Sequence, residues 1–113
     1  MKEKTEAKIQ QEIFIYIVNN YCLEHHNPRY VFYSVPNDSS SKEETMRKLA
    51  TGIKAGAADC VLLMPSRCIF IEVKTETGVQ SDNQKQFEKQ VKALGFEYYL
   101  IRSLDQLKSQ LNL

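Results

Sequence analysis

The sequence contains only three cysteines, three prolines, four glycines and no tryptophan among its 113 residues. Cys22, Cys60 and Cys68 have no Cys-x-x-Cys spacing and are odd in number, which indicates neither a zinc site nor a disulfide framework. Three cysteines are also too few for a four-cysteine iron–sulfur cluster. We expect buried thiols in a reducing compartment.

Long apolar runs and a strong net charge are missing as well. The longest apolar run, residues 13–18, is far too short to span a bilayer, and residues 1–10 are charged and lack a signal-type apolar stretch. We therefore expect a cytoplasmic protein that does not bind membranes. The net charge is only +1, so any affinity for nucleic acid must come from local basic clusters. The length allows one compact domain, residues 1–113.

A β-hairpin is predicted in the middle of the chain. Residues 59–64 and 68–74 are apolar runs, and residues 65–67 between them, Pro-Ser-Arg, are a turn signal. A turn centred between the proline and the serine pairs Asp59 with Glu72. Directly opposed residues have β-carbons roughly 4.5 to 5.5 Å apart, so the two carboxylates are expected to face one another. A register shift of one residue would place them on opposite faces.

The polar end of this hairpin has the composition of a metal-dependent nuclease site. Lys74 follows Glu72 on the same face of the strand. Buried acids need partners, and a divalent cation would supply one. Asp59, Glu72 and a backbone carbonyl, which we assign to Val73, form an all-oxygen ligand set that suits Mg²⁺ or Mn²⁺. Lys74 would then orient a metal-activated water or stabilise the charge that develops on a phosphodiester. The alternative is a surface hairpin with ordinary charges.

Further residues around the hairpin carry a resemblance to a known family: they are GIKAGAADCVLL at 52–63, IEVK at 71–74, Gly78, Ser81, Gln84 and Phe87, with flanking similarity at 35–37 and 98–103. This pattern resembles the VRR-NUC domain, the virus-type replication-repair branch of the PD-(D/E)XK nucleases. The resemblance implies metal binding at Asp59 and Glu72, catalysis aided by Lys74 and a supporting role for Gln84. Ala58 departs from the pattern, since proline commonly precedes the aspartate. That proline shapes the backbone and does no chemistry.

The order of the predicted elements, αβββαβα, indicates an α/β fold, and the resemblance implies a restriction-endonuclease-like architecture in which helices flank a mixed four-stranded central sheet. The strand–helix–strand unit near the end implies a crossover, so the last strand is expected to run parallel to the second hairpin strand. A short helix is also expected at residues 43–51. The main elements are expected to be a helix at 5–24, strands at 29–35, 59–64 and 68–74, a helix after Ser81, a strand at 96–101 and a helix after Ser103.

Two helices are expected to bring further side chains to the site. Glu6 lies on the inward stripe of the first helix, which makes it a candidate third acid near the metal. A solvated glutamate favoured by the helix dipole is the open alternative. Ser81 and Gln84 have the spacing of a capping box, so Gln84 serves the helix cap, the active site or both. Phe87, Val91 and Leu94 should face the core.

Basic and apolar residues outside the site suggest partners. Arg47, Lys48 and Lys54 lead towards the first aspartate and are predicted to contact DNA phosphates, as is Lys85, although solvated surface charges are the alternative. Phe14 and Ile15 lie away from the inward stripe of their helix, which suggests a second apolar face and a homodimer.

The functional hypothesis is a divalent-metal-dependent endonuclease that acts on DNA without a small-molecule cofactor. The resemblance implies branched DNA as substrate, with four-way (Holliday) junctions preferred, because single-domain VRR-NUC proteins look like symmetric resolvases. Three alternatives remain open: a flap or linear-duplex nuclease of replication and repair, a non-cleaving nucleic-acid-binding module, and an RNA-cutting domain.

Overall fold

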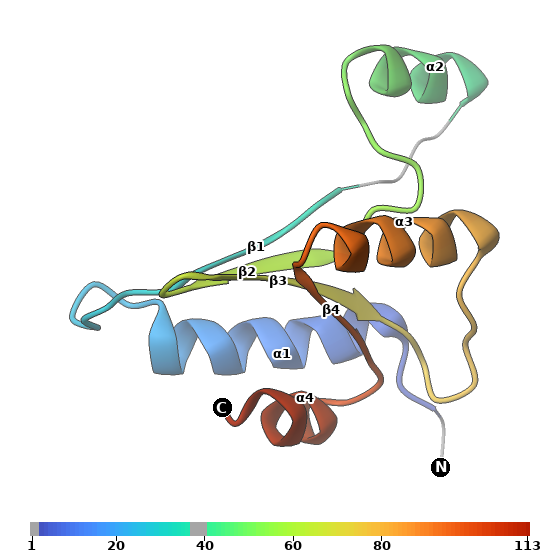
Figure 1. Ribbon diagram of the computed structural model, residues 1–113. Coiled ribbons are helices and arrows are strands. Elements are labelled where there is room, and N and C mark those ends of the chain that lie inside the picture. Colours follow the sequence, from blue (N-terminus) through green and yellow to red (C-terminus); the bar gives the residue numbers. More distant parts are fainter. Residues whose placement is uncertain (1–2, 37–40) are drawn as a thin grey trace.

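The computed structural model describes residues 3–36 and 41–113 (Figure 1). Its centre is a mixed four-stranded sheet with the strand order β1-β2-β3-β4. β1, β2 and β3 are antiparallel neighbours, and β4 runs parallel to β3, as the predicted crossover requires. The strands are β1 (Val31–Ser34), β2 (Cys60–Met64), β3 (Arg67–Val73) and β4 (Glu97–Ile101). The helices are α1 (Glu6–Tyr21), α2 (Lys42–Ala50), α3 (Asp82–Ala93) and α4 (Leu104–Leu111).

The α/β class and the mixed four-stranded sheet are therefore confirmed. The short helix expected at residues 43–51 is α2, which stands between β1 and β2, so the order αβββαβα holds once this helix is added. The first helix ends at Tyr21, earlier than expected. Among the helices of the described segments, none combines the length and apolarity that a bilayer crossing requires.

The main core lies between the sheet and the layer formed by α1 and α4 (Figure 1). α1 presents Ile9, Ile13 and Ile17 at helical spacing, and all three are buried. Burial of one such side chain stabilises the fold by about 1.5–3 kcal/mol. They pack with Phe32, Cys60, Leu62, Ile69, Ile71, Val73, Ile101, Leu107 and Leu111. This core fixes which face of the hairpin points inward, and with it the hairpin register.

α3 covers the opposite face of the sheet, over β3 and β4 (Figure 1). Val91 and Tyr98 are buried there, with Phe87 packed against them. Leu94 was expected to face this core, but it is 75% exposed. The helix ends at Ala93, and Leu94 is its C-cap, where the chain leaves the helix for β4. The inward stripe is therefore one residue shorter than the periodicity predicted.

α2 stands apart from the sheet (Figure 1). None of its residues is buried, and Met46 and Leu49 are largely exposed. On the side of the sheet that α3 partly covers, Val31, Tyr33 and Leu63 remain 38–50% exposed. The protein thus carries an uncovered apolar surface on β1 and β2.

The cysteines correct one expectation in part. All three are free, as predicted. Only Cys60 is buried, however, whereas Cys22 and Cys68 are half-buried. Cys60 faces the main core, whereas its neighbour Val61 on β2 is buried on the opposite face of the sheet.

Candidate active site

The hairpin has the predicted register. Val61 pairs with Phe70 and Leu63 with Cys68, so the two turn residues are Pro65 and Ser66. Proline restricts φ to negative values, and Ser66 takes the positive φ of 60°. This turn sets the pairing at the far end of the hairpin, where Asp59 stands opposite Glu72.

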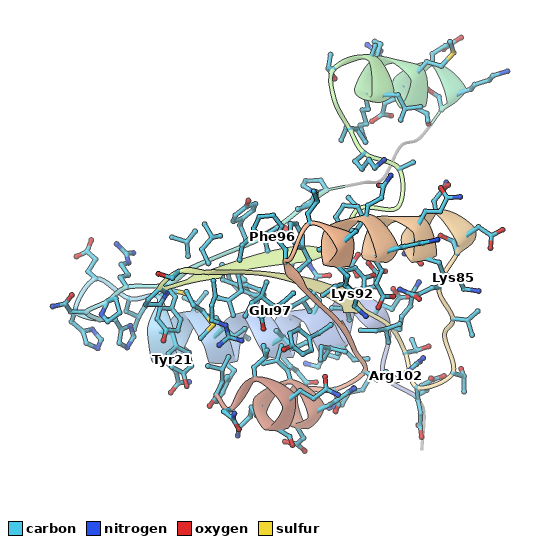
Figure 2. The ribbon with its side chains drawn as sticks, viewed as in Figure 1. Tyr21, Lys85, Lys92, Phe96, Glu97 and Arg102 are labelled. Carbon is cyan, nitrogen blue, oxygen red and sulfur yellow. The ribbon has the colours of Figure 1, made fainter. Side chains whose placement is uncertain are left out.

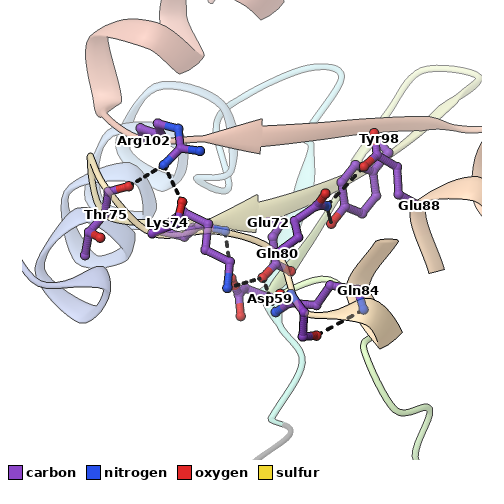
Figure 3. A network of polar contacts seen from close by, with 12 residues as sticks. Asp59, Glu72, Lys74, Thr75, Gln80, Gln84, Glu88, Tyr98 and Arg102 are labelled. Atoms are coloured by element: carbon purple, nitrogen blue, oxygen red, sulfur yellow. Dashed lines mark hydrogen bonds and ion pairs between the residues drawn. The ribbon is translucent and has the colours of Figure 1, made fainter. Parts of the chain in front are cut away.

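Asp59 lies at the junction of three strands. Its backbone carbonyl accepts a hydrogen bond from the Val35 N–H at 2.8 Å, which extends the pairing of β1 with β2. Its side-chain Oδ2 accepts from the Val73 N–H at 2.7 Å. These contacts direct the carboxylate across the hairpin towards the segment that carries Glu72 and Lys74 (Figure 3).

Glu72 is the buried acid of the site, with an exposed fraction of 0%. Its Oε2 accepts a hydrogen bond from Gln84 Nε2 at 2.6 Å and lies 3.7 Å from Lys74 Nζ. Its Oε1 is buried and has no hydrogen-bond partner among the described residues. A buried polar atom without a hydrogen-bond partner destabilises the folded state by about 1–3 kcal/mol, and by more when the group is charged. This carboxylate oxygen is therefore placed to bind a cation.

The surroundings of Glu72 disfavour the charged form of its side chain. Burial raises the pKa of this carboxyl to about 7, and repulsion by Asp59 adds to the effect, whereas Lys74 opposes it. Repulsion between two carboxylates at one point is what a shared cation relieves.

Gln84 connects the first turn of α3 to the site. Ser81 Oγ accepts from the Gln84 N–H at 3.2 Å, and Gln84 Oε1 accepts from the Ser81 N–H at 2.9 Å, which completes a capping box. The other end of the same amide, Nε2, donates to Glu72. One side chain therefore both caps the helix and contacts Glu72.

A loop glycine packs directly on this helix end. Gly56 has a φ of +80°, and a β-carbon there would lie 2.3 Å from the backbone oxygen of Asn83. The segment that leads into Asp59 is therefore pressed against the first turn of α3, where Gln84 sits.

The donor groups fit a hard divalent cation. Asp59 and Glu72 supply carboxylate oxygens, and Oε1 of Glu72 has no hydrogen-bond partner among the described residues. Within residues 3–36 and 41–113, no group of three or more Asp, Glu, His or Cys side chains is close enough to hold a metal. A cation would therefore need backbone carbonyl or water oxygens as well, which is the usual arrangement for Mg²⁺.

Glu6 does not complete such a group. It lies exposed in the first turn of α1. The charge of Glu6 raises the pKa of Glu72, but the charge of Asp59 raises it more. Glu6 is thus near enough to act on the site electrostatically without forming a three-acid cluster with the other two carboxylates.

The predicted DNA-binding residues fall into two groups. Lys54 is exposed in the loop that precedes the first acid, and the exposed Lys85 follows Gln84 on α3 (Figure 2). Arg47 and Lys48 lie in the last turn of α2, which stands away from the sheet (Figure 1), and Lys48 pairs with Glu44 at 3.0 Å. The first pair thus lies on segments next to site residues in the sequence, and the second pair lies on the outlying helix.

Sequence reasoning missed a polar network around the site. Gln80 Nε2 donates to the Tyr98 hydroxyl at 3.1 Å and to Glu88 Oε1 at 3.0 Å (Figure 3). Burial raises the pKa of Tyr98, with a further contribution from the charge of Glu72. Arg102 lies at the same sheet edge and binds three backbone carbonyls. No local spacing signals these contacts, because they depend on the β3–β4 pairing.

Comparisons with known proteins place the fold. No family model matches the sequence, and no curated protein matches it either. Among solved structures, a VRR_NUC domain protein matches with a TM-score of 0.78 at 17% sequence identity, covering 99% of this chain and 88% of that chain. The VRR-NUC resemblance in the sequence is thus confirmed at the level of the fold: the chain folds as a VRR_NUC domain does.

Proposed function

We propose that this protein is a nuclease that uses Mg²⁺ or Mn²⁺ to hydrolyse DNA phosphodiester bonds. The observation that carries the proposal is Oε1 of the buried Glu72, which lacks a hydrogen-bond partner within residues 3–36 and 41–113 and lies in a side chain beside Asp59 and Lys74. Two acids can hold the cation for such hydrolysis, and an amine beside them can stabilise the developing negative charge. The VRR_NUC fold supports the same conclusion.

Each residue has a distinct role in this proposal. Asp59, Glu72 and the Val73 carbonyl hold the cation, with Glu6 as a more distant acid. Gln84 and Lys74 occupy Oε2 of Glu72 and so leave Oε1 for the cation. When bound, the cation would lower the pKa of a coordinated water and supply the nucleophile for in-line attack. Lys74 would orient that nucleophile or stabilise the charge on the phosphorus centre.

For the substrate, we propose branched DNA, with a four-way junction as the preferred form. Lys54 and Lys85, and further out Arg47 and Lys48, would contact the phosphates that flank the cleaved bond. A domain of this size has little surface with which to read base edges, so the shape of the DNA is the more accessible signal.

We further propose that the protein acts as a homodimer in the cytoplasm. The sequence suggested a dimer through Phe14 and Ile15, which are 46% and 52% exposed. The uncovered apolar surface formed by Val31, Tyr33 and Leu63 is a second candidate for the interface. Two sites related by a dimer axis would allow paired nicks in a junction. The three free cysteines support a reducing compartment.

A cleavage panel tests the proposal. Purified protein is incubated with junction, flap, nicked, linear-duplex and single-stranded DNA and with RNA, across a titration of Mg²⁺ or Mn²⁺. We expect metal-dependent nicking that is fastest on the junction and absent in Asp59→Asn and Glu72→Gln. Glu97→Gln, which removes a carboxylate paired with Arg67 at the other end of β3, is the matched control and should retain activity.

The alternatives give different results in the same panel. A flap or duplex nuclease would cut those substrates faster than the junction, and an RNA-cutting domain would prefer RNA. Binding that survives chelation, with no product on any substrate, would identify a non-cleaving module and overturn the proposal. Light scattering of the same sample tests the dimer.

A further inference from the structure

Arg102 gathers three backbone carbonyls around one nitrogen. Its Nη1 donates to the carbonyl oxygens of Thr75 at 2.6 Å, Gly78 at 2.7 Å and Glu76 at 3.2 Å. Three carbonyl dipoles that converge on one point repel one another unless a cationic donor lies between them. The guanidinium supplies that donor through charge-assisted hydrogen bonds.

The turn held in this way follows directly after Lys74. β3 and β4 are parallel, Val73 pairs with Ile101, and the Lys74 N–H donates to the Ile101 carbonyl at 3.0 Å. Arg102 therefore directly follows Ile101, the residue to which the backbone of Lys74 is hydrogen-bonded. Its own N–H donates to Gln106 Oε1 at 2.7 Å, which ties it to the first turns of α4.

The turn also packs against the side chain of Lys74. The Gly78 N–H donates to the Thr75 carbonyl at 3.3 Å and closes the turn. A β-carbon at Gly78 would lie 3.5 Å from Cδ of Lys74 and 3.0 Å from Oγ1 of Thr75. The turn thus packs along the aliphatic part of the Lys74 side chain, whose ammonium nitrogen lies 3.7 Å from Glu72 Oε2.

We propose that Arg102 is a positioning residue for Lys74. By fixing residues 75–78 it confines the lysine stem and keeps the ammonium beside Glu72. Because this role concerns the site proposed above, it rests on the proposed function. Arg102 touches neither carboxylate in the described contacts, so its effect must pass through the turn.

The test compares Arg102→Met with Arg67→Met. Arg67 is the matched control, because it also binds through its guanidinium, to Glu97 at 2.8 and 2.6 Å, but at the other end of β3. On the preferred DNA substrate we expect Arg102→Met to lower kcat by about 10- to 100-fold, the usual range for a supporting group, with KM and the salt dependence of binding unchanged. Arg67→Met should keep wild-type kcat.

A second readout does not depend on cleavage. The rate of reductive methylation of Lys74, followed by mass spectrometry of peptides, reports how well the ammonium is held and shielded. We expect this rate to rise several-fold in Arg102→Met and to stay at the wild-type value in Arg67→Met. In Arg102→Ala, guanidinium ion added to the buffer should restore part of both the protection and the kcat, whereas ammonium ion should not.

The outcomes separate the proposals. If wild type and Arg67→Met cleave no substrate, the proposed function fails, and the methylation rates still decide the role of Arg102. Unchanged Lys74 reactivity in a folded Arg102→Met protein would overturn the positioning role. So would a raised KM with a shallower salt dependence, because that result would make Arg102 a phosphate contact.

Discussion

Replacing Glu72 by glutamine is expected to stabilise the protein when no metal is present. The wild-type carboxylate is buried, repelled by Asp59 and left with one oxygen unsatisfied among the described residues. Glutamine keeps the shape and removes the charge. Its carbonyl can accept the hydrogen bond from Gln84, and its amide group can face the other acid. The same change should abolish activity, so stability and activity are expected to move in opposite directions.

The magnitude follows from the pKa of Glu72. Burial raises this pKa from its ordinary 4.5 to about 7, so between these values the folded state binds more protons than the unfolded state. The free energy of unfolding of the wild type therefore falls as pH rises through that window, and the loss is complete above about pH 7. One pKa unit corresponds to about 1.4 kcal/mol, so the full loss is about 3 kcal/mol. Lys74 loses a partner in the variant, which reduces the expected gain to about 1–3 kcal/mol.

Urea unfolding of both proteins with a chelator, at about pH 4.5 and about pH 8, measures this difference. We expect the variant to be more stable only at the higher pH. Added Mg²⁺ should raise the stability of the wild type, since a ligand of the folded state stabilises it, and should not raise that of the variant. Glu97→Gln is a control of opposite sign, because Arg67 lowers the pKa of Glu97 and its charge is favourable. A Glu72→Gln protein that is less stable than wild type at pH 8 without metal would refute this reasoning.

Three further substitutions test other parts of the structure. Gln84→Met removes both the side-chain cap contact and the hydrogen bond to Glu72. It should therefore lower the free energy of unfolding by about 1 kcal/mol in thermal unfolding and also reduce kcat. A lower stability with full kcat would show that the residue acts as a cap alone. Gly56→Ala places a β-carbon against Asn83 and should destabilise the fold. Gly52→Ala is the control, because Gly52 also has a positive φ but a β-carbon there would meet nothing within 4 Å, so its loss of stability should be smaller. Equal losses would mean that the structure around Gly56 adjusts to the added β-carbon. Tyr33→Lys should halve the particle mass in light scattering if the uncovered sheet surface forms the dimer, and an unchanged dimer would exclude that surface.

The sequence contained enough information for the hairpin because its determinants are local. Pro65 and Ser66 set the turn, and alternation along residues 59–64 and 68–74 leaves one register that buries the apolar side chains. The capping box at Ser81 was predictable for the same reason, since both partners lie within one helical turn. The burial of single residues was less predictable. Leu94 has the right periodicity but sits at a helix end, where the chain direction changes.

Contacts between distant segments were beyond sequence reasoning. Arg102 binds carbonyls that precede it by 24 to 27 residues, and this contact exists only because β4 lies parallel to β3. The proximity of Gly56 to the first turn of α3 was likewise not predictable, because no pattern within one segment encodes its distance from another segment. Candidate ligands were found because their residue types are rare in apolar strands, whereas the groups that hold them use ordinary side chains and backbone atoms.

Two independent elements restrain the short segment from Glu72 to Lys74. On one side, the first turn of α3 holds Glu72 through Gln84. On the other, the end of β4 holds the turn beside Lys74 through Arg102. The two restraints act on side chains of opposite charge that lie 3.7 Å apart, so loosening either one should change the spacing between the acid and the amine. If both restraints serve this spacing, combining Gln84→Met with Arg102→Met should lower kcat by less than the product of the single effects, because the first change already releases the pair. Fully multiplicative effects in such a double-mutant cycle would show instead that the two residues act on separate features of the site.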